Sequence, residues 1–142
     1  MSASGAVGSS SVAVPMFENK SLESGLQQAL TDSLIQGFVT DGALRVLNED
    51  RAHLLLQGKI LEVREEPFTY SGGTEQFRIS IILEVSCYDS QEKKPLWEES
   101  GLSGFGVFDA LQDRQEARIN GLNDAIRMLV EDVIDRTQVG GW

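Results

Sequence analysis

A strict alternation of apolar and polar side chains runs from Phe77 to Tyr88 and constrains the fold more than any other feature of the sequence. Side chains of a β-strand point alternately to its two faces, so a period of two residues predicts a strand with one buried face. A strand of this length needs neighbouring strands and an apolar layer packed against it. The residues expected on the buried face are Phe77, Ile79, Ile81, Leu83, Val85 and Cys87.

Further strands are expected on both sides of this segment. The β-branched run at 12–14 predicts a short first strand that ends near Pro15. Turn residues then delimit a second strand at 43–47, a third at 54–64 and a fifth at 96–102, with a loop over 103–108. The connection 67–74 contains the pair Gly72-Gly73, which is suited to positive φ, so the third and fourth strands are expected to form a long hairpin.

Two segments have helical spacing of their apolar residues. The first runs from about Leu22 to Asp41, with Ser21 as the expected N-cap and Gly42 as the expected left-handed residue after the helix. The second runs over 111–137 and has an amphipathic pattern. Its apolar stripe is formed by Ile119, Leu122, Ile126, Leu129, Val130, Val133 and Ile134.

The order of these elements is β-α-β-β-β-β-α, which predicts an α+β fold. Hairpin connections favour a mainly antiparallel sheet of four or five strands, with the two helices packed on one of its faces. A chain of 142 residues can bury one hydrophobic core, so residues 12–142 are expected to form a single domain. Residues 1–11, MSASGAVGSSS, are small and polar and are expected to be a flexible lead-in.

The charge distribution argues against nucleic-acid binding. The chain has 12 basic and 22 acidic residues, a net charge of -10, and Lys93-Lys94 is the only adjacent basic pair. Phosphate recognition requires clustered Lys and Arg. The sequence also lacks an apolar stretch of about 20 residues, so no membrane-spanning helix is expected.

Residues suited to catalysis or metal binding are scarce. His53 is the only histidine and Cys87 the only cysteine, which argues against a hydrolytic triad and against a zinc site. Neighbouring acids such as Glu65 and Glu66 would point to opposite faces of a strand. The glycine-rich stretch 101–106 does not match a phosphate-binding loop. No catalytic residue, metal site or cofactor is therefore expected.

The start of the chain carries a family resemblance. VAVPMFENKS at 12–21, followed by Gly25-Leu26 and a helix containing ALTDSLIQGF at 29–38, resembles the opening of LptE-like proteins. LQGKI at 56–60 is similar to a later strand of that family. Further segments occur in the same order up to about residue 137, and these are FRI at 77–79, LWEE at 96–99 and the closing acidic helix.

The resemblance implies a non-enzymatic lipoprotein on the periplasmic side of the outer membrane. It would associate with the LptD β-barrel, assist assembly of that barrel and help to deliver lipopolysaccharide to the outer leaflet. The chain lacks the lipobox cysteine and the Pro-containing segment that precede the first strand in this family. We expect these to be lost with the secretion signal, so the only membrane attachment expected is an N-terminal lipid anchor absent from this sequence. The alternatives are another periplasmic interaction lipoprotein, such as a curli-type secretion-channel accessory, and an enzyme of unrecognised type.

Aromatic and glycine residues in two expected loops are the candidates for partner binding, since exposed rings are favoured interface anchors. They are Phe68, Tyr70, Gly72 and Gly73 near the hairpin tip, and Phe105 and Phe108 in the loop after the fifth strand. The alternative is that these rings fold back over the end of the sheet.

Lipopolysaccharide contact in the resembled family involves basic side chains near the hairpin turn and before the last helix. The tip 70–74 has no Lys or Arg. The nearest candidates are Arg78, Arg114 and Arg118. The alternative, which the sequence favours, is that they are ordinary surface charges.

Overall fold

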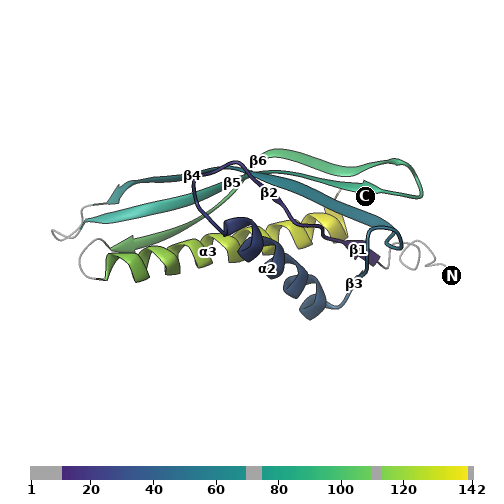
Figure 1. Ribbon diagram of the computed structural model, residues 1–142, viewed down its shortest axis with the longest axis horizontal. Helices are drawn as coiled ribbons and strands as arrows, with labels where there is room; N and C mark the ends of the chain where they lie inside the picture. The colour runs from purple at the N-terminus through teal and green to yellow at the C-terminus, as the bar shows by residue number, and fades with distance from the viewer. Residues whose placement is uncertain (1–10, 70–74, 110–112, 141–142) are drawn as a thin grey trace.

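Three long antiparallel strands form the centre of the structure (Figure 1). The structure is a computed structural model, and it describes residues 11–69, 75–109 and 113–140. Two helices cover one face of these strands, and several short strands extend the sheet beyond the first long strand. In chain order the elements are β1 (Ser11–Ala13), β2 (Glu18–Asn19), α2 (Leu26–Asp41), β3 (Arg45–Val46), β4 (Leu54–Thr69), β5 (Gln76–Asp89), β6 (Lys94–Asp109), α3 (Arg114–Asp135) and the π-helical turn η2 (Arg136–Gly140).

The α+β class and the mainly antiparallel sheet are confirmed. The strand order is β3-β1-β4-β5-β6, and β2 pairs separately with β4. The two long ladders, β4 with β5 and β5 with β6, are antiparallel, whereas the short strands pair in parallel. The sheet has six strands instead of four or five, because the two-residue β2 is too short to be recognised from a sequence pattern.

The alternation that predicted the central strand is confirmed. On β5 the side chains of Ile79, Ile81, Leu83, Val85 and Cys87 are buried, while Phe77 is half-buried. Both helices lie on the face to which these side chains point (Figure 1). Gly37 lets α2 approach α3 closely, because a Cβ at that position would lie 2.6 Å from a methyl group of Val130.

The first helix starts four residues later than expected. Leu22 is exposed and lies outside the helix, and Gly25, with φ of +81°, precedes the first helical residue. Ser21 is not the N-cap, since its backbone N–H and its hydroxyl both donate to Asn19 Oδ1 in a local turn. The end of the helix is as predicted, because Gly42 has φ of +81° and its N–H donates to the Phe38 carbonyl.

The prediction of a loop at 103–108 is wrong, because these residues belong to β6. Gly104 and Gly106 point towards α3, where a side chain would collide with the helix backbone at Ala125 and Gly121. The glycines are therefore needed for close helix–sheet packing and do not mark a loop. Similarly, β4 continues to Thr69, so Phe68 lies in a strand and not in the hairpin connection.

Other boundaries also differ from the sequence predictions. Ser11, expected at the end of a flexible lead-in, is buried in β1, and residues 1–10 lie outside the described part of the chain. In α3 most of the expected stripe is buried, but Ile119 is exposed. Cys87 is buried, and burial raises the pKa of its thiol to about 12.

Candidate partner-binding surface

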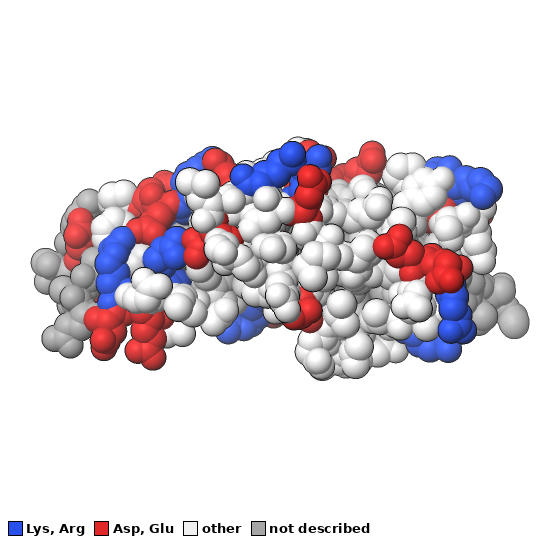
Figure 2. Space-filling model, viewed as in Figure 1, with Lys and Arg blue, Asp and Glu red and all other residues white. Residues whose placement is uncertain are grey.

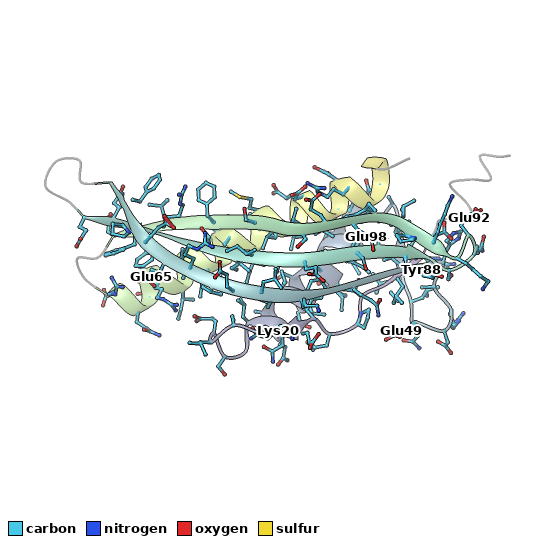
Figure 3. All side chains as sticks on the ribbon, turned by 90° about the horizontal axis from the view of Figure 1, so that it is seen from above. Lys20, Glu49, Glu65, Tyr88, Glu92 and Glu98 are labelled. Atoms are coloured by element: carbon cyan, nitrogen blue, oxygen red, sulfur yellow. The ribbon has the colours of Figure 1, made fainter. Side chains whose placement is uncertain are left out.

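The face of the sheet opposite the helices is built from alternate residues of β4, β5 and β6. Figure 3 looks onto this open face, with the helices behind the strands. Tyr88 lies towards one end of the long strands in this view, and Glu65 towards the other. On β5 the open-face side chains are exposed or half-buried, and they are Arg78, Ser80, Ile82, Glu84, Ser86 and Tyr88.

Two aromatic rings flank an arginine near the β4–β5 connection. The guanidinium carbon of Arg78 lies 5.2 Å from the ring centre of Phe68 and 5.4 Å from that of Phe105. The three residues come from β5, β4 and β6, respectively, and the strand register brings them together. Phe68 is 48% exposed and Phe105 38% exposed. We call these three residues the open-face cluster.

The open-face cluster combines exposed apolar surface with a fixed cation. Stacking on the two rings orients the Arg78 guanidinium through cation–π attraction. Its nearest carboxylate, on Glu66, lies 3.9 Å away, which is long for a hydrogen bond. The buried Nε of Arg78 has no hydrogen-bond partner among the described residues. This arrangement can pack against an apolar partner and can also donate hydrogen bonds to a carbonyl, carboxylate or phosphate oxygen.

Phe108 lies on the opposite side of the sheet from the open-face cluster. It is buried, and its ring stacks on Phe77 with the ring centres 5.8 Å apart. Arg114, at the start of α3, lies over both rings. The expectation of an exposed loop ring at this position is therefore wrong, because β6 continues to Asp109 and its alternation directs Phe108 towards the helix.

Arg114 and Arg118 bind carboxylates of their own chain. Arg118 donates to Glu23 at 2.7 Å and to Glu65 at 2.9 Å, and Arg114 also pairs with Glu65. The hydrogen bond from Arg118 lowers the pKa of the Glu23 carboxyl, and the same bond is the main cause that raises the pKa of Arg118. These ion pairs join α3 to β4 and to the segment before α2. Of the three arginines expected to contact lipopolysaccharide, only Arg78 therefore lies on the open face.

The remaining expected partner-binding residues, Tyr70, Gly72 and Gly73, lie outside the described residues. The structure nevertheless brings together Phe68 and Phe105, which are 37 positions apart in the chain and were expected in two separate loops. The position of Arg78 between these two rings was not predicted from the sequence. The alternation of β5 placed Arg78 on the polar face, but only the register of three strands puts it beside both rings.

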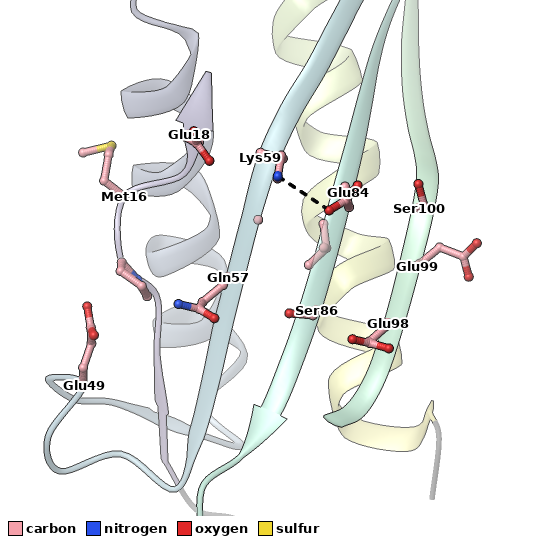
Figure 4. Close-up of a pocket in the computed structure, with 13 residues that line it drawn as sticks. Met16, Glu18, Glu49, Gln57, Lys59, Glu84, Ser86, Glu98, Glu99 and Ser100 are labelled. Carbon is pink, nitrogen blue, oxygen red and sulfur yellow. Dashed lines mark ion pairs between the residues drawn. The ribbon is translucent and has the colours of Figure 1, made fainter. Parts of the chain in front are cut away.

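A shallow groove of about 650 Å³ crosses the other half of the open face (Figure 4). Its floor consists of the cross-strand rows Gln57–Ser86–Glu98 and Lys59–Glu84–Ser100. Lys59 and Glu84 face each other, with 3.9 Å between Nζ and the carboxylate. The groove residues were not selected from the sequence, although the alternation of β5 places Glu84 and Ser86 on one face.

Metal binding has no support in the described part of the chain. Among residues 11–69, 75–109 and 113–140, no three His, Cys, Asp or Glu side chains are placed to hold a metal ion. The only histidine, His53, pairs with Asp89 at 2.9 Å, and both side chains are about nine-tenths buried. Burial alone would raise the pKa of Asp89, but hydrogen bonds from Glu92, His53 and Gln91 lower it.

Charges of both signs are spread along the molecule in Figure 2, with uncharged side chains in the middle of the view. In this view the basic side chains do not form a continuous stripe that could follow a phosphate backbone. Neither of the described helices combines the length and the apolar character needed to cross a membrane.

Comparison with known proteins identifies the relatives of this chain. The family model described as LptE, lipopolysaccharide-assembly, matches residues 9–137. No curated protein gives a significant sequence match. Solved structures with the same fold include protein CT253 from Chlamydia trachomatis, with a TM-score of 0.63 and 11% identity, covering 92% of this chain and 96% of that one.

Two further structures extend this likeness. Protein XCC0632 from Xanthomonas campestris has a TM-score of 0.59 and 15% identity, covering 92% of this chain and 83% of that one. A minor lipoprotein from Acinetobacter baumannii has a TM-score of 0.58 and 11% identity, covering 90% of this chain and 91% of that one. At these identities the structures establish the fold alone, whereas the family model covers almost the whole chain.

Proposed function

Because the chain belongs to the LptE family of lipopolysaccharide-assembly proteins, we propose that it is the body of a non-enzymatic outer-membrane lipoprotein that associates with an LptD-type β-barrel. In this role it assists assembly of the barrel and delivery of lipopolysaccharide to the outer leaflet. Its place is the periplasmic side of the outer membrane, with attachment through an N-terminal lipid. The observation that carries the proposal is the family match over residues 9–137.

The open-face cluster is the surface that we assign to the barrel. Its two rings are partly exposed although they are large and apolar, and exposed aromatic residues with arginine are the residue types enriched at interface hot spots. The helices cover only the opposite face of the sheet, so a partner can approach the cluster directly (Figure 3). Tyr70 in the neighbouring connection stays a candidate for the same contact.

Arg78 is the residue that we assign to lipopolysaccharide. Its guanidinium is oriented by Phe68 and Phe105 and has only a long contact with Glu66, so its donors can reach an anionic head group. Arg114 and Arg118 are weaker candidates, because the carboxylates of Glu65 and Glu23 already accept their hydrogen bonds.

Co-purification with the barrel tests the proposal. The chain is expressed behind a lipoprotein signal sequence together with the LptD-type barrel of the same organism, and the amount of barrel recovered with it is measured. The double variant Phe68→Ala/Phe105→Ala is expected to weaken association by more than about 1 kcal/mol, because truncating interface hot spots typically costs this much or more.

The matched control is Tyr88→Ala, which removes an open-face aromatic ring of similar exposure at the far end of β5. It is expected to leave recovery of the barrel unchanged. The proposed function is wrong if the wild-type chain does not recover the barrel. If Tyr88→Ala and the double variant reduce recovery equally, the open-face cluster is not the barrel-binding surface.

A further inference from the structure

The two edges of the sheet are built differently. One edge consists of β3, β1 and β2, which are two or three residues long. The other edge is β6, which spans 16 residues and, within the described part of the chain, pairs only with β5. An unpaired strand edge presents a row of backbone N–H and C=O groups that can bind another strand, and proteins usually protect such edges. The first edge is protected because its strands are very short, whereas the long β6 needs another form of protection.

The first half of β6 carries the usual protective features. Lys94, Pro95, Glu98 and Glu99 lie in it, and charged residues and proline discourage edge pairing. Its pairing with β5 is also irregular, since the register shifts at Leu96 and again at Gly101, where φ is +89°. A second strand cannot pair regularly along this half.

The second half, Leu102–Phe108, has none of these features. Its sequence LSGFGVF contains neither a charged residue nor proline. Its register with β5 is unbroken from Leu102, opposite Leu83, to Phe108, opposite Phe77. The structure therefore leaves a regular, uncharged edge of seven residues next to a protected one.

Apolar side chains flank this edge on both faces of the sheet. On the open face lie Phe105, which belongs to the open-face cluster, and the half-buried Val107. On the other face Met128 of α3 follows Gly121 and Ala125 at helical spacing, and these two contact the β6 glycines. Met128 is 39% exposed, and the C-terminal half of α3 emerges beyond β6 in Figure 3. A strand added to this edge would bury apolar groups on both of its faces.

We propose that the outer edge of Leu102–Phe108 binds an extended, uncharged segment of the barrel partner as an additional strand of the sheet. This inference rests on the proposed function and names the part of the partner that the site takes. Backbone hydrogen bonds would supply the affinity, and contacts of the added strand with Phe105 and Met128 would set its preference for apolar side chains. A second copy of the chain is a poorer occupant, because each copy carries a net charge of -10 and the two would repel each other.

A pair of serine variants tests the proposal in the co-expressed complex. Ser103→Lys places a charge on the exposed face of the unprotected half, where a docked strand would have to desolvate it. Ser100→Lys makes the same change in the protected half of the same strand and serves as the control. We expect Ser103→Lys to lower recovery of the barrel by about fivefold or more and Ser100→Lys to change it by less than about twofold.

Hydrogen exchange of the purified complex gives a readout that side-chain contacts alone would not produce. In the wild-type complex the backbone amides of 102–108 that do not already bond to β5 are expected to exchange at least about tenfold more slowly than in the free chain, with no comparable change at 94–100. Added-strand pairing is overturned if 102–108 gains no protection, or if both lysine variants reduce recovery equally.

The outcomes separate this inference from the proposed function. A wild-type chain that binds the barrel without protection at 102–108 refutes only the added strand. A wild-type chain that does not bind the barrel refutes both. If the free chain is a dimer and Ser103→Lys makes it a monomer, the edge belongs to a second copy, and the assignment to the barrel is wrong.

Discussion

Gly121 of α3 packs directly against Gly106 of β6, and a Cβ on Gly106 would lie 2.8 Å from the Gly121 Cα. Real Cβ contacts are essentially never this short, so the helix backbone would have to move to admit any side chain. This contact, with the neighbouring contact of Gly104 against Ala125, determines how closely α3 approaches the sheet.

The first prediction follows from this contact. Gly106→Ala is expected to lower the free energy of unfolding by about 1 to 3 kcal/mol, because over-packing a tight interface forces backbone shifts. Chemical denaturation measures the change. Ser103→Ala, on the exposed face of the same strand, is the control and is expected to change stability by less than about 0.5 kcal/mol. Equal effects of the two substitutions would contradict the close packing.

The second prediction concerns the two faces of β5. Ile81 is fully buried beneath the helices, whereas its neighbour Ile82 is half-buried on the open face. Ile81→Asp should cost several kcal/mol and severely destabilise the fold, because it buries an unpaired carboxylate. Ile82→Asp should cost clearly less, since water can reach its carboxylate. Thermal unfolding of both variants checks the assignment, and a melting temperature that falls more for Ile82→Asp would mean that the faces are inverted.

The third prediction is a pH dependence that arises from Glu23. Its pKa in the folded protein lies below the ordinary value of 4.5, because Arg118 donates hydrogen bonds to the carboxylate. A lowered pKa stabilises the fold above the unfolded-state pKa, and this stabilisation is lost as the pH falls through the folded-state pKa. Arg118→Met removes the donor, so it should destabilise the protein by roughly 1.5 to 3 kcal/mol at pH 7, the cost expected for losing a hydrogen bond to a charged group.

The difference between the wild type and Arg118→Met should shrink as the pH falls below about 4.5, because protonated Glu23 no longer depends on the arginine. Denaturation at a series of pH values measures this difference. Arg127→Met is the control, since Arg127 is exposed and its one ion pair within the described ranges is with Asp124 of the same helix. A difference that stays constant between pH 7 and pH 3 would rule out the proposed cause.

Some parts of the fold could be predicted because their cause is local. The alternation of β5 identified its buried side chains, since the period of a strand is a property of the chain itself. Gly42 was correctly placed after the first helix because a left-handed residue is a local requirement for ending a helix. The antiparallel hairpins and the α+β class followed from the order of such local signals.

The errors at Ser21, Phe108 and the stretch 103–108 arose where the sequence pattern did not show which partner each segment would have. Ser21 has the side chain of a typical N-cap, but its hydroxyl donates a hydrogen bond to Asn19 Oδ1. The glycines at 104 and 106 are typical of a loop, yet they lie in a strand, because Ala125 and Gly121 of α3, 15 or more positions later in the chain, pack onto them. At Phe108 and over 103–108 a contact with another part of the structure overrides the local preference, whereas at Ser21 the competing partner, Asn19, is only two residues away.

The sequence by itself therefore determined the periodicity of the main elements, the α+β class and the likeness to the LptE family, all of which are recognised from short segments and from their order along the chain. Only the tertiary structure decided that Phe68, Arg78 and Phe105 form one cluster, that Phe108 is buried, and that half of β6 is left as an open edge. The physical reason is that strand register and helix contact join residues distant in sequence, and the energies that fix them belong to pairs of segments and not to either segment alone.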